Sequence, residues 1–144
     1  MSDPTVDSLI GRRAQVRLLV AEADTALEMG SGDVPVLATP RIVALCEQAT
    51  CLAITGVLPD ELTTVGVEVS IRHRRASWPG EAVDAQAEVV SADPRRIEFL
   101  VQVHRVCNPD SSMTGEDAAA IILATGTITR AIVRRDAFDR PEPR

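Results

Sequence analysis

The strongest constraint on this chain's fold is one helix-forming segment that is apolar on almost every side. It runs from Arg41 to Thr55 and reads RIVALCEQATCLAIT. Thr39 is a favoured N-cap and Pro40 suits the first helical position. Gly56, followed by Pro59, is typical of a helix end. Because a helix with so little polar surface is normally buried, the rest of the chain has to cover it.

The segments around this helix carry the alternating pattern of β-strands. One strand is expected before the helix and four after it, over residues 11–20, 62–75, 81–92, 95–107 and 119–134. Turn-forming pairs at Pro79-Gly80 and Asp93-Pro94 separate the later strands. We expect an α+β fold in which an antiparallel, meander-like sheet wraps around one long central helix. Because edge strands of such sheets commonly pair, we expect a homodimer.

Length and composition place the chain among single-domain proteins. Its 144 residues suit one domain, 1–144, with a tail from about residue 136 expected to be flexible. A net charge of −6 argues against nucleic-acid binding, and no apolar run is long enough to span a membrane. The N-terminal segment has no signal-peptide pattern, which predicts a cytoplasmic protein.

The cysteines do not indicate a metal site or a disulfide framework. Cys46, Cys51 and Cys107 form no even set, and their spacing matches no zinc pattern. Cys46 and Cys51 lie in the apolar helical run, where we expect them to pack as small apolar side chains. The sequence therefore predicts neither metal nor cofactor.

Glu47 is the first candidate for chemistry. No basic residue lies three or four positions from it on the helix. A carboxylate in apolar surroundings must find hydrogen bonds or take a raised pKa, which is common among catalytic groups. The alternative is that this side of the helix meets solvent, where a Glu needs no explanation.

His73 is the second candidate. It continues the odd-numbered series Val65, Val67, Val69 and Ile71, so its imidazole should lie on the face that meets the helix. The alternative is an ordinary core or rim histidine. His104 instead shares the polar face of its strand with Glu98 and Gln102, and we expect it to be exposed.

Thr39 is the third candidate. It is expected to cap the helix, but a helix N-terminus also offers free N–H groups and a positive dipole end. These groups suit a substrate carbonyl or an oxyanion. Glu47 lies eight residues further along the helix.

Three segments together resemble one enzyme family. VLATPRIVALCEQATCLAI, TTVGVEVSIRHRRASWPGE and TGTITRAIVRRDAF resemble the small hot-dog fold acyl-CoA thioesterases related to fluoroacetyl-CoA thioesterase, from about Val36 to Phe138. The resemblance implies a Thr, Glu and His active site, which falls on Thr39, Glu47 and His73. It also implies that Gly66 approaches the substrate or completes the site.

The resemblance predicts hydrolysis of an acyl-CoA thioester. Glu47 would act as nucleophile or as general base on water, and His73 would transfer protons or orient the water. Coenzyme A is anionic, so arginines should bind its phosphates. The first candidates are those next to His73, and weaker candidates lie elsewhere on the strands: Arg72, Arg74 and Arg75, then Arg95, Arg96, Arg130, Arg134 and Arg135.

Two departures from the family pattern qualify this hypothesis. The last strand usually reads Gly-Thr-His-x-Arg, but Ile128 stands in place of that His here. Residues 22–38 contain no aromatic side chain to gate a fluorinated two-carbon acyl group, which favours a broader or different acyl-CoA. The alternatives are a non-catalytic acyl-CoA-binding protein, a hydratase or dehydratase of the same fold, and an unrelated α+β ligand-binding protein.

Overall fold

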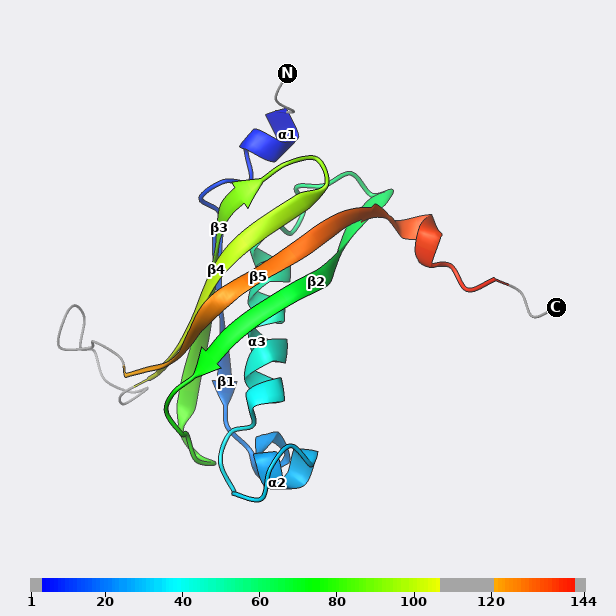
Figure 1. Ribbon diagram of the computed structural model, residues 1–144. Helices are drawn as coiled ribbons and strands as arrows, with labels where there is room; N and C mark the ends of the chain where they lie inside the picture. Colours follow the sequence, from blue (N-terminus) through cyan, green and yellow to red (C-terminus); the bar gives the residue numbers. More distant parts are fainter. Residues whose placement is uncertain (1–3, 107–120, 142–144) are drawn as a thin grey trace.

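The computed structural model describes residues 4–106 and 121–141. A five-stranded sheet curls around one long helix, α3 (Figure 1). The elements in chain order are α1 (Pro4–Asp7), β1 (Arg13–Leu19), η1 (Glu22–Asp24), α2 (Ala26–Met29), α3 (Thr39–Ala53), β2 (Leu62–His73), β3 (Ala82–Ala92), β4 (Arg96–Arg105), β5 (Ile122–Arg134) and η3 (Arg135–Phe138). The single α+β sheet-and-helix architecture is the one that the sequence predicted.

The strand order is β1-β3-β4-β5-β2, with every neighbouring pair antiparallel. β3, β4 and β5 form the expected meander, but extending that meander to β2 is wrong because β2 pairs with β5. β1 occupies the other side of β3, where Ala14 lies opposite Ala87. β2 is therefore an edge strand, and its middle, residues 66–70, is exposed.

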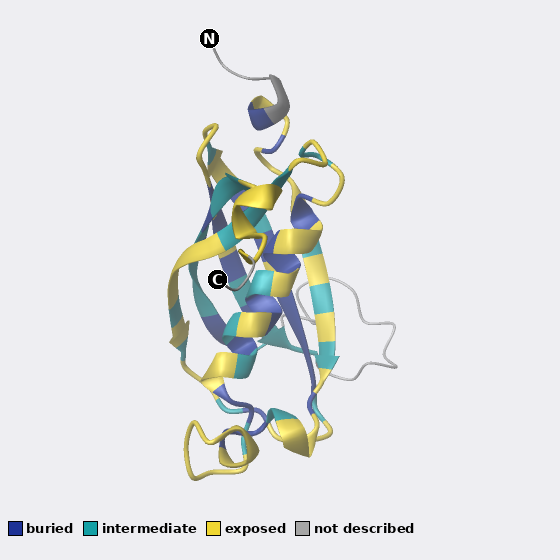
Figure 2. Cartoon of the chain, turned by 90° about the vertical axis from the view of Figure 1, so that its right-hand side faces the viewer, coloured by how far each residue is buried: buried dark blue, intermediate teal, exposed yellow. Residues whose placement is uncertain are grey.

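The core lies between α3 and the inner face of the sheet. Phe99, Ile128 and Val89 are buried there against Ile42 and Leu45 of the helix. α3 packs chiefly on β1 and β3, so its other side stays open to solvent (Figure 2). The expectation of a helix buried nearly all round is wrong for this reason: a single sheet covers only one side, and the exposed positions include Ala44, Gln48, Cys51 and Leu52.

Of the two cysteines of α3, one lies on the buried side of the helix and the other on the exposed side. Cys46 is buried, and burial together with the neighbouring Glu47 charge raises the pKa of its thiol to about 12. It packs as the apolar residue that the sequence predicted. Cys51 is exposed, so the same prediction is wrong for it. Cys107 lies outside the described residues.

The start of α3 differs from the sequence-based prediction by one residue. Ala38 is the N-cap, Thr39 is the first helical residue and Pro40 follows it. Thr39 therefore does not cap the helix with its side chain. Its hydroxyl is left available for a contact outside the helix.

A β-bulge in β2 changes which side chains face the helix. Pairing with β5 shifts between Gly66 and Glu68, so Val67 is the extra residue. Gly66 then shares the inner face with Val69 and, further along the strand, His73. The prediction that Val65 and Val67 share the inner face with His73 is wrong because the bulge reverses the alternation.

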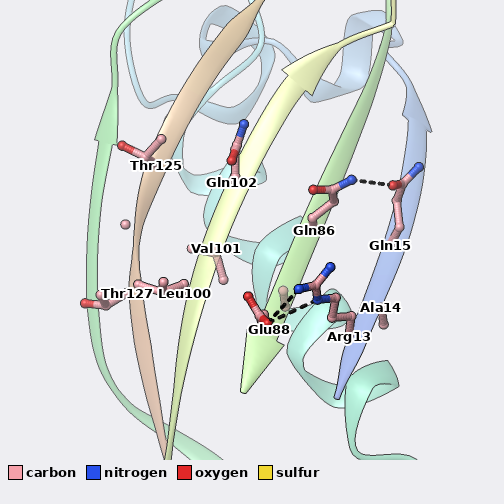
Figure 3. Close-up of a pocket in the computed structure, with 12 residues that line it drawn as sticks. Arg13, Ala14, Gln15, Gln86, Glu88, Leu100, Val101, Gln102, Thr125 and Thr127 are labelled. Atoms are coloured by element: carbon pink, nitrogen blue, oxygen red, sulfur yellow. Dashed lines mark hydrogen bonds and ion pairs between the residues drawn. The ribbon is translucent and has the colours of Figure 1, made fainter. Parts of the chain in front are cut away.

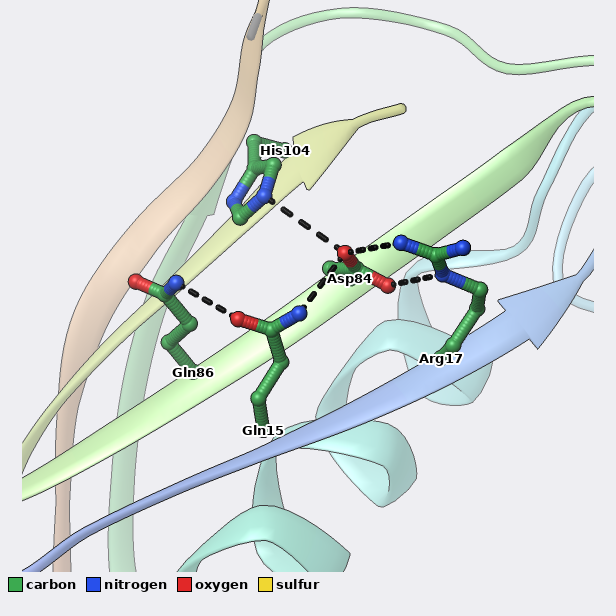
Figure 4. Close-up of polar contacts among 5 residues, drawn as sticks. All are labelled: Gln15, Arg17, Asp84, Gln86 and His104. Atoms are coloured by element: carbon green, nitrogen blue, oxygen red, sulfur yellow. Dashed lines mark hydrogen bonds and ion pairs between the residues drawn. The ribbon is translucent and has the colours of Figure 1, made fainter. Parts of the chain in front are cut away.

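The outer face of the sheet holds a buried polar cluster (Figure 4). Asp84 is 2% exposed and accepts hydrogen bonds from Gln15 at 2.8 Å and from Arg17 at 2.8 and 3.0 Å. His104 lies 3.8 Å from Asp84, and its side chain is 16% exposed. His104 is on the predicted face, but the prediction that it is solvent-exposed is wrong because these neighbours cover it.

Gly126 permits the close pairing of β5 with β2. A Cβ at this position would overlap the backbone carbonyl oxygen of Ser70 and crowd Ile71. We expect Gly126→Ala to lower the free energy of unfolding by about 1–3 kcal/mol, because the two strands must separate locally. Denaturant unfolding measures this, with Thr127→Ala as the neighbouring control. Equal stability of Gly126→Ala and the native protein would contradict this account.

Candidate active site

Thr39 and His73 meet where α3 begins and β2 ends. The Thr39 hydroxyl lies 2.8 Å from Nδ1 of His73. The Nε2 atom of His73 is buried and has no hydrogen-bond partner among the described residues. Burial lowers the pKa of His73, and the backbone of Arg75 opposes that shift in part. The imidazole is thus held by Thr39 on one nitrogen and favours the neutral form.

Glu47, Gly66 and Arg130 form a second polar group, about two turns along α3. Oε2 of Glu47 lies 3.5 Å from a terminal guanidinium nitrogen of Arg130, and the Glu47 side chain is 38% exposed. A Cβ on Gly66 would lie 2.6 Å from the same carboxylate oxygen. A side chain at position 66 would therefore displace the carboxylate from the place it has beside Arg130.

Arg130 is fixed from the opposite side by β2. Its Nε donates to Thr64 Oγ1 at 2.9 Å, and its second terminal nitrogen donates to the Thr64 carbonyl at 3.2 Å. Arg130 is 7% exposed and faces inward from β5, paired with Gly66 across the strands. Its guanidinium therefore joins Glu47 to the edge strand instead of lying at the surface.

The two groups are separate within one chain. Thr39 and Glu47 are eight residues apart on α3, which places their Cα atoms about 12 Å apart along the axis. Gly66 and His73 are seven residues apart on β2, at most about 23 Å along an extended strand. Among the described residues, no hydrogen bond or ion pair joins the Thr39–His73 group to the Glu47–Gly66–Arg130 group.

Three arginines near His73 have no partner in the described structure. Arg72, Arg74 and Arg75 are exposed and make no ion pair or side-chain hydrogen bond. The same is true of the side chains of Arg95 and Arg96, at the turn between β3 and β4. By contrast, Arg134 pairs with Asp136 at 2.9 Å, and Arg135 donates to backbone carbonyls of Asp60 and Leu62.

The outer face of the sheet carries a groove of about 790 Å³ (Figure 3). Its floor is the backbone of β1, β3, β4 and β5. Four of its polar side chains pair with one another: Gln86 donates to Gln15 at 2.7 Å, and Arg13 bonds Glu88 at 3.0 Å. None of the sequence-predicted site residues lines it. In the described residues, no group of three or more His, Cys, Asp or Glu side chains is placed to hold a metal ion.

The sequence missed the role of Thr64 and the burial of Arg130. Arg130 was a candidate for a surface phosphate contact, since strand periodicity alone does not show which face of the last strand is inward. Counting forward by two residues from buried Ile128 would have placed Arg130 inward. Thr64 carries no comparable signal, because its position depends on the bulge.

The fold and these polar groups define a class of protein. An antiparallel five-stranded sheet wrapped around one long helix is the hot-dog fold, and the solved structures confirm it.

The fluoroacetyl-CoA-specific thioesterase FlK has a similar structure. As a point mutant in complex with fluoroacetate and CoA, it is 23% identical to this chain. The match covers 90% of this chain and 98% of that chain at a TM-score of 0.75. A Thermus thermophilus hypothetical protein of the thioesterase superfamily is 21% identical, with 89% and 85% covered at a TM-score of 0.74. A hot-dog-like protein from Thermanaerovibrio acidaminovorans is 18% identical, with 91% and 89% covered at 0.73.

A match to a protein-family model shows which family this chain belongs to. Residues 20–136 match the model of the fluoroacetyl-CoA-specific thioesterase family, and the chain belongs to this family. Its activity is therefore hydrolysis of an acyl-CoA thioester, as the sequence predicted. A search of curated protein sequences gave no match. Among the described elements, none is a helix of the length and apolarity needed to cross a membrane.

The buried imidazole generates a prediction about pH. Because burial lowers its pKa, His73 should titrate below the ordinary value of about 6.5. The unfolded chain then binds a proton that the folded chain does not, so His73 makes the fold less stable as pH falls below that value. NMR titration of the imidazole protons measures this, and a His104→Gln variant assigns the signals. A midpoint at or above 6.5 for His73 would contradict it.

Proposed function

We propose that this thioesterase works as a homodimer whose active sites each combine Thr39 and His73 of one subunit with Glu47, Gly66 and Arg130 of the other. The observation that carries the proposal is the separation of the two polar groups within one chain. Each group contains part of the predicted Thr, Glu and His site, and both face the same uncovered edge at β2. A second copy paired along that edge would bring them together.

The β2 edge has the pattern needed to pair with itself. In an antiparallel pair centred on Ser70, Glu68 of each subunit lies opposite Arg72 of the partner. Opposite charges in this position stabilise a strand pair. On the inner face, Val69 lies opposite Ile71 of the partner. Val69 is 40% exposed in the single chain, so pairing would bury apolar surface. We therefore assign Arg72 to the interface and not to the substrate.

The same register supports the composite site. It places His73 opposite the bulge at Gly66 and Val67 of the partner subunit. Bulges commonly lie beside active sites, where they redirect side chains. The exposed side of α3, which includes Leu52 at 48% exposure, lies next to this edge and offers further apolar surface for the dimer.

The chemistry follows from the two ends of the composite site. Hydrolysis adds water to the acyl carbonyl, breaks the C–S bond and leaves a proton on the CoA thiol. Glu47 supplies the carboxylate that attacks the carbonyl or takes a proton from water, and Arg130, 3.5 Å away, orients it. His73, neutral at the start with a free Nε2, accepts the proton that the water releases and passes it to the departing thiolate. Thr39 and the first N–H groups of α3 stabilise the carbonyl oxygen.

The acyl group is proposed to be broader than fluoroacetyl. The FlK point mutant was solved with fluoroacetate and CoA as its ligands. In this chain no aromatic residue lies between residues 22 and 38 to form a tight gate. A screen of acyl-CoAs that differ in length and branching, run on the purified protein, tests this directly. We also propose that the activity is cytoplasmic.

The carboxylate should be essential. We expect Glu47→Gln to lower kcat by about 10²–10⁴-fold, since the amide neither attacks a carbonyl nor accepts a proton. Steady-state kinetics on the best acyl-CoA measure this. Glu61→Gln, which changes an exposed carboxylate just before β2, is the matched control and should keep full activity. Full activity of Glu47→Gln would refute a role for this residue in the chemistry.

The composite site predicts complementation between two inactive variants. Glu47→Gln and His73→Ala homodimers each lack a complete site. After co-refolding, half of the dimers are mixed, and each mixed dimer regains one intact site, so about one quarter of native activity should return. If each site lay within one chain, no mixture would contain an intact site, and activity would stay at the level of the separate variants.

A further inference from the structure

The loop between β2 and β3, residues 74–81, carries features that the reaction chemistry leaves unused. It contains Arg74, Arg75 and Trp78, all exposed, with Trp78 at 49%. In Figure 1 this loop lies at the end of the molecule where α3 begins, next to the strand end that carries His73. Building on the proposed function, we propose that this loop binds the nucleotide end of coenzyme A, with Trp78 stacking on the adenine and Arg74 and Arg75 holding the phosphates.

The loop is braced, although its tip is exposed. Arg105 pairs with Glu81 and donates to the Ala76 carbonyl at 2.6 Å. The Ser77 carbonyl accepts the Leu37 N–H at 2.8 Å, and the Gly80 N–H donates to the Val20 carbonyl at 2.9 Å. These bonds fix the loop backbone, so binding at Trp78 needs little ordering of the main chain. Rigid, half-exposed aromatic rings are favourable surfaces for stacking a base.

The charges of the loop also indicate an anionic ligand. The chain carries a net charge of −6, and most arginines of the described strands are paired with a carboxylate or a carbonyl. Arg74 and Arg75 have no such partner among the described residues. Adjacent guanidinium groups without a partner in an acidic protein suit the phosphates of a nucleotide.

The spacing from the reaction site fits the length of the ligand. Trp78 is five residues beyond His73, so its Cα lies at most about 18 Å from that of His73. The pantetheine arm has roughly the chain length of four extended peptide residues, about 14 Å from sulfur to phosphorus. The arm of a thioester held at His73 is therefore long enough to bring the nucleotide to this loop.

Fluorescence can report on Trp78 alone, because it is the chain's one tryptophan and the chain has no tyrosine. We would titrate the native protein with CoA, with adenosine 3′,5′-bisphosphate and with pantetheine, following Trp fluorescence. We expect saturable quenching by CoA and by the bisphosphate, and none by pantetheine. Quenching by pantetheine alone, or none by CoA when calorimetry shows that CoA binds, would overturn the proposal.

Kinetics of variants give a second, independent readout. Trp78→Ala and the double variant Arg74→Ala/Arg75→Ala should each raise KM for acyl-CoA about tenfold with kcat unchanged. Neither should affect the acyl-pantetheine substrate, which lacks the nucleotide. Arg95→Ala/Arg96→Ala changes two exposed arginines beside Asp93 at the opposite end of the sheet, which this proposal leaves without a role at the nucleotide; it is the matched control and should leave KM unchanged.

The outcomes separate this inference from the proposed function. Loss of kcat in the loop variants, or an equal KM effect in the Arg95/Arg96 control, would overturn the nucleotide site while the thioesterase activity stood. Absence of hydrolysis by the native protein on every acyl-CoA would refute the proposed function. The fluorescence titration would still test nucleotide binding in that case, because it needs no turnover.

Discussion

The offset of a single helix beneath a five-stranded sheet is the constraint on which the rest of the structure depends. α3 is the one long helix among the described residues, and it packs chiefly on β1 and β3. The width of the sheet exceeds what one helix covers, so β2 is left with its middle exposed and its inner face only partly covered. Both polar groups of the candidate site lie along this uncovered strip, at the positions where side chains of α3 still reach β2.

Within that strip, a glycine and a bulge determine where the carboxylate sits. The bulge at Val67 turns Gly66 toward the helix, and the missing side chain leaves room for Glu47. Arg130 then connects the carboxylate to β5 and, through Thr64, to β2. A carboxylate beside the apolar core is costly unless it is paired, and this pairing removes much of the cost. The sheet edge and the site are therefore one structural unit.

The sequence predicted the elements well because their patterns are local. The apolar run after Pro40 marks α3, and alternation marks all five strands to within a few residues. Features that depend on pairing were not predictable in this way. The order of the strands places β2 beside β5, and the bulge reverses the faces of Val65 and Gly66. The exposure of His104 was mispredicted for the same reason, because Asp84 of the neighbouring strand β3 lies 3.8 Å from its imidazole.

Ile128 shows how the same pairing limits the chemistry available to this chain. The thioesterases that this chain resembles usually carry a His at this position of the last strand. Here Ile128 is fully buried on the inner face, between Phe99 of β4 and Val69 of β2. An apolar side chain at this point accepts no proton, so the strip between the two polar groups is hydrophobic. Among the described residues, His73 is then the one imidazole on the inner face. In the proposed reaction, the imidazole available for proton transfer is therefore the one at the end of β2, beside Thr39 and the loop that carries Trp78.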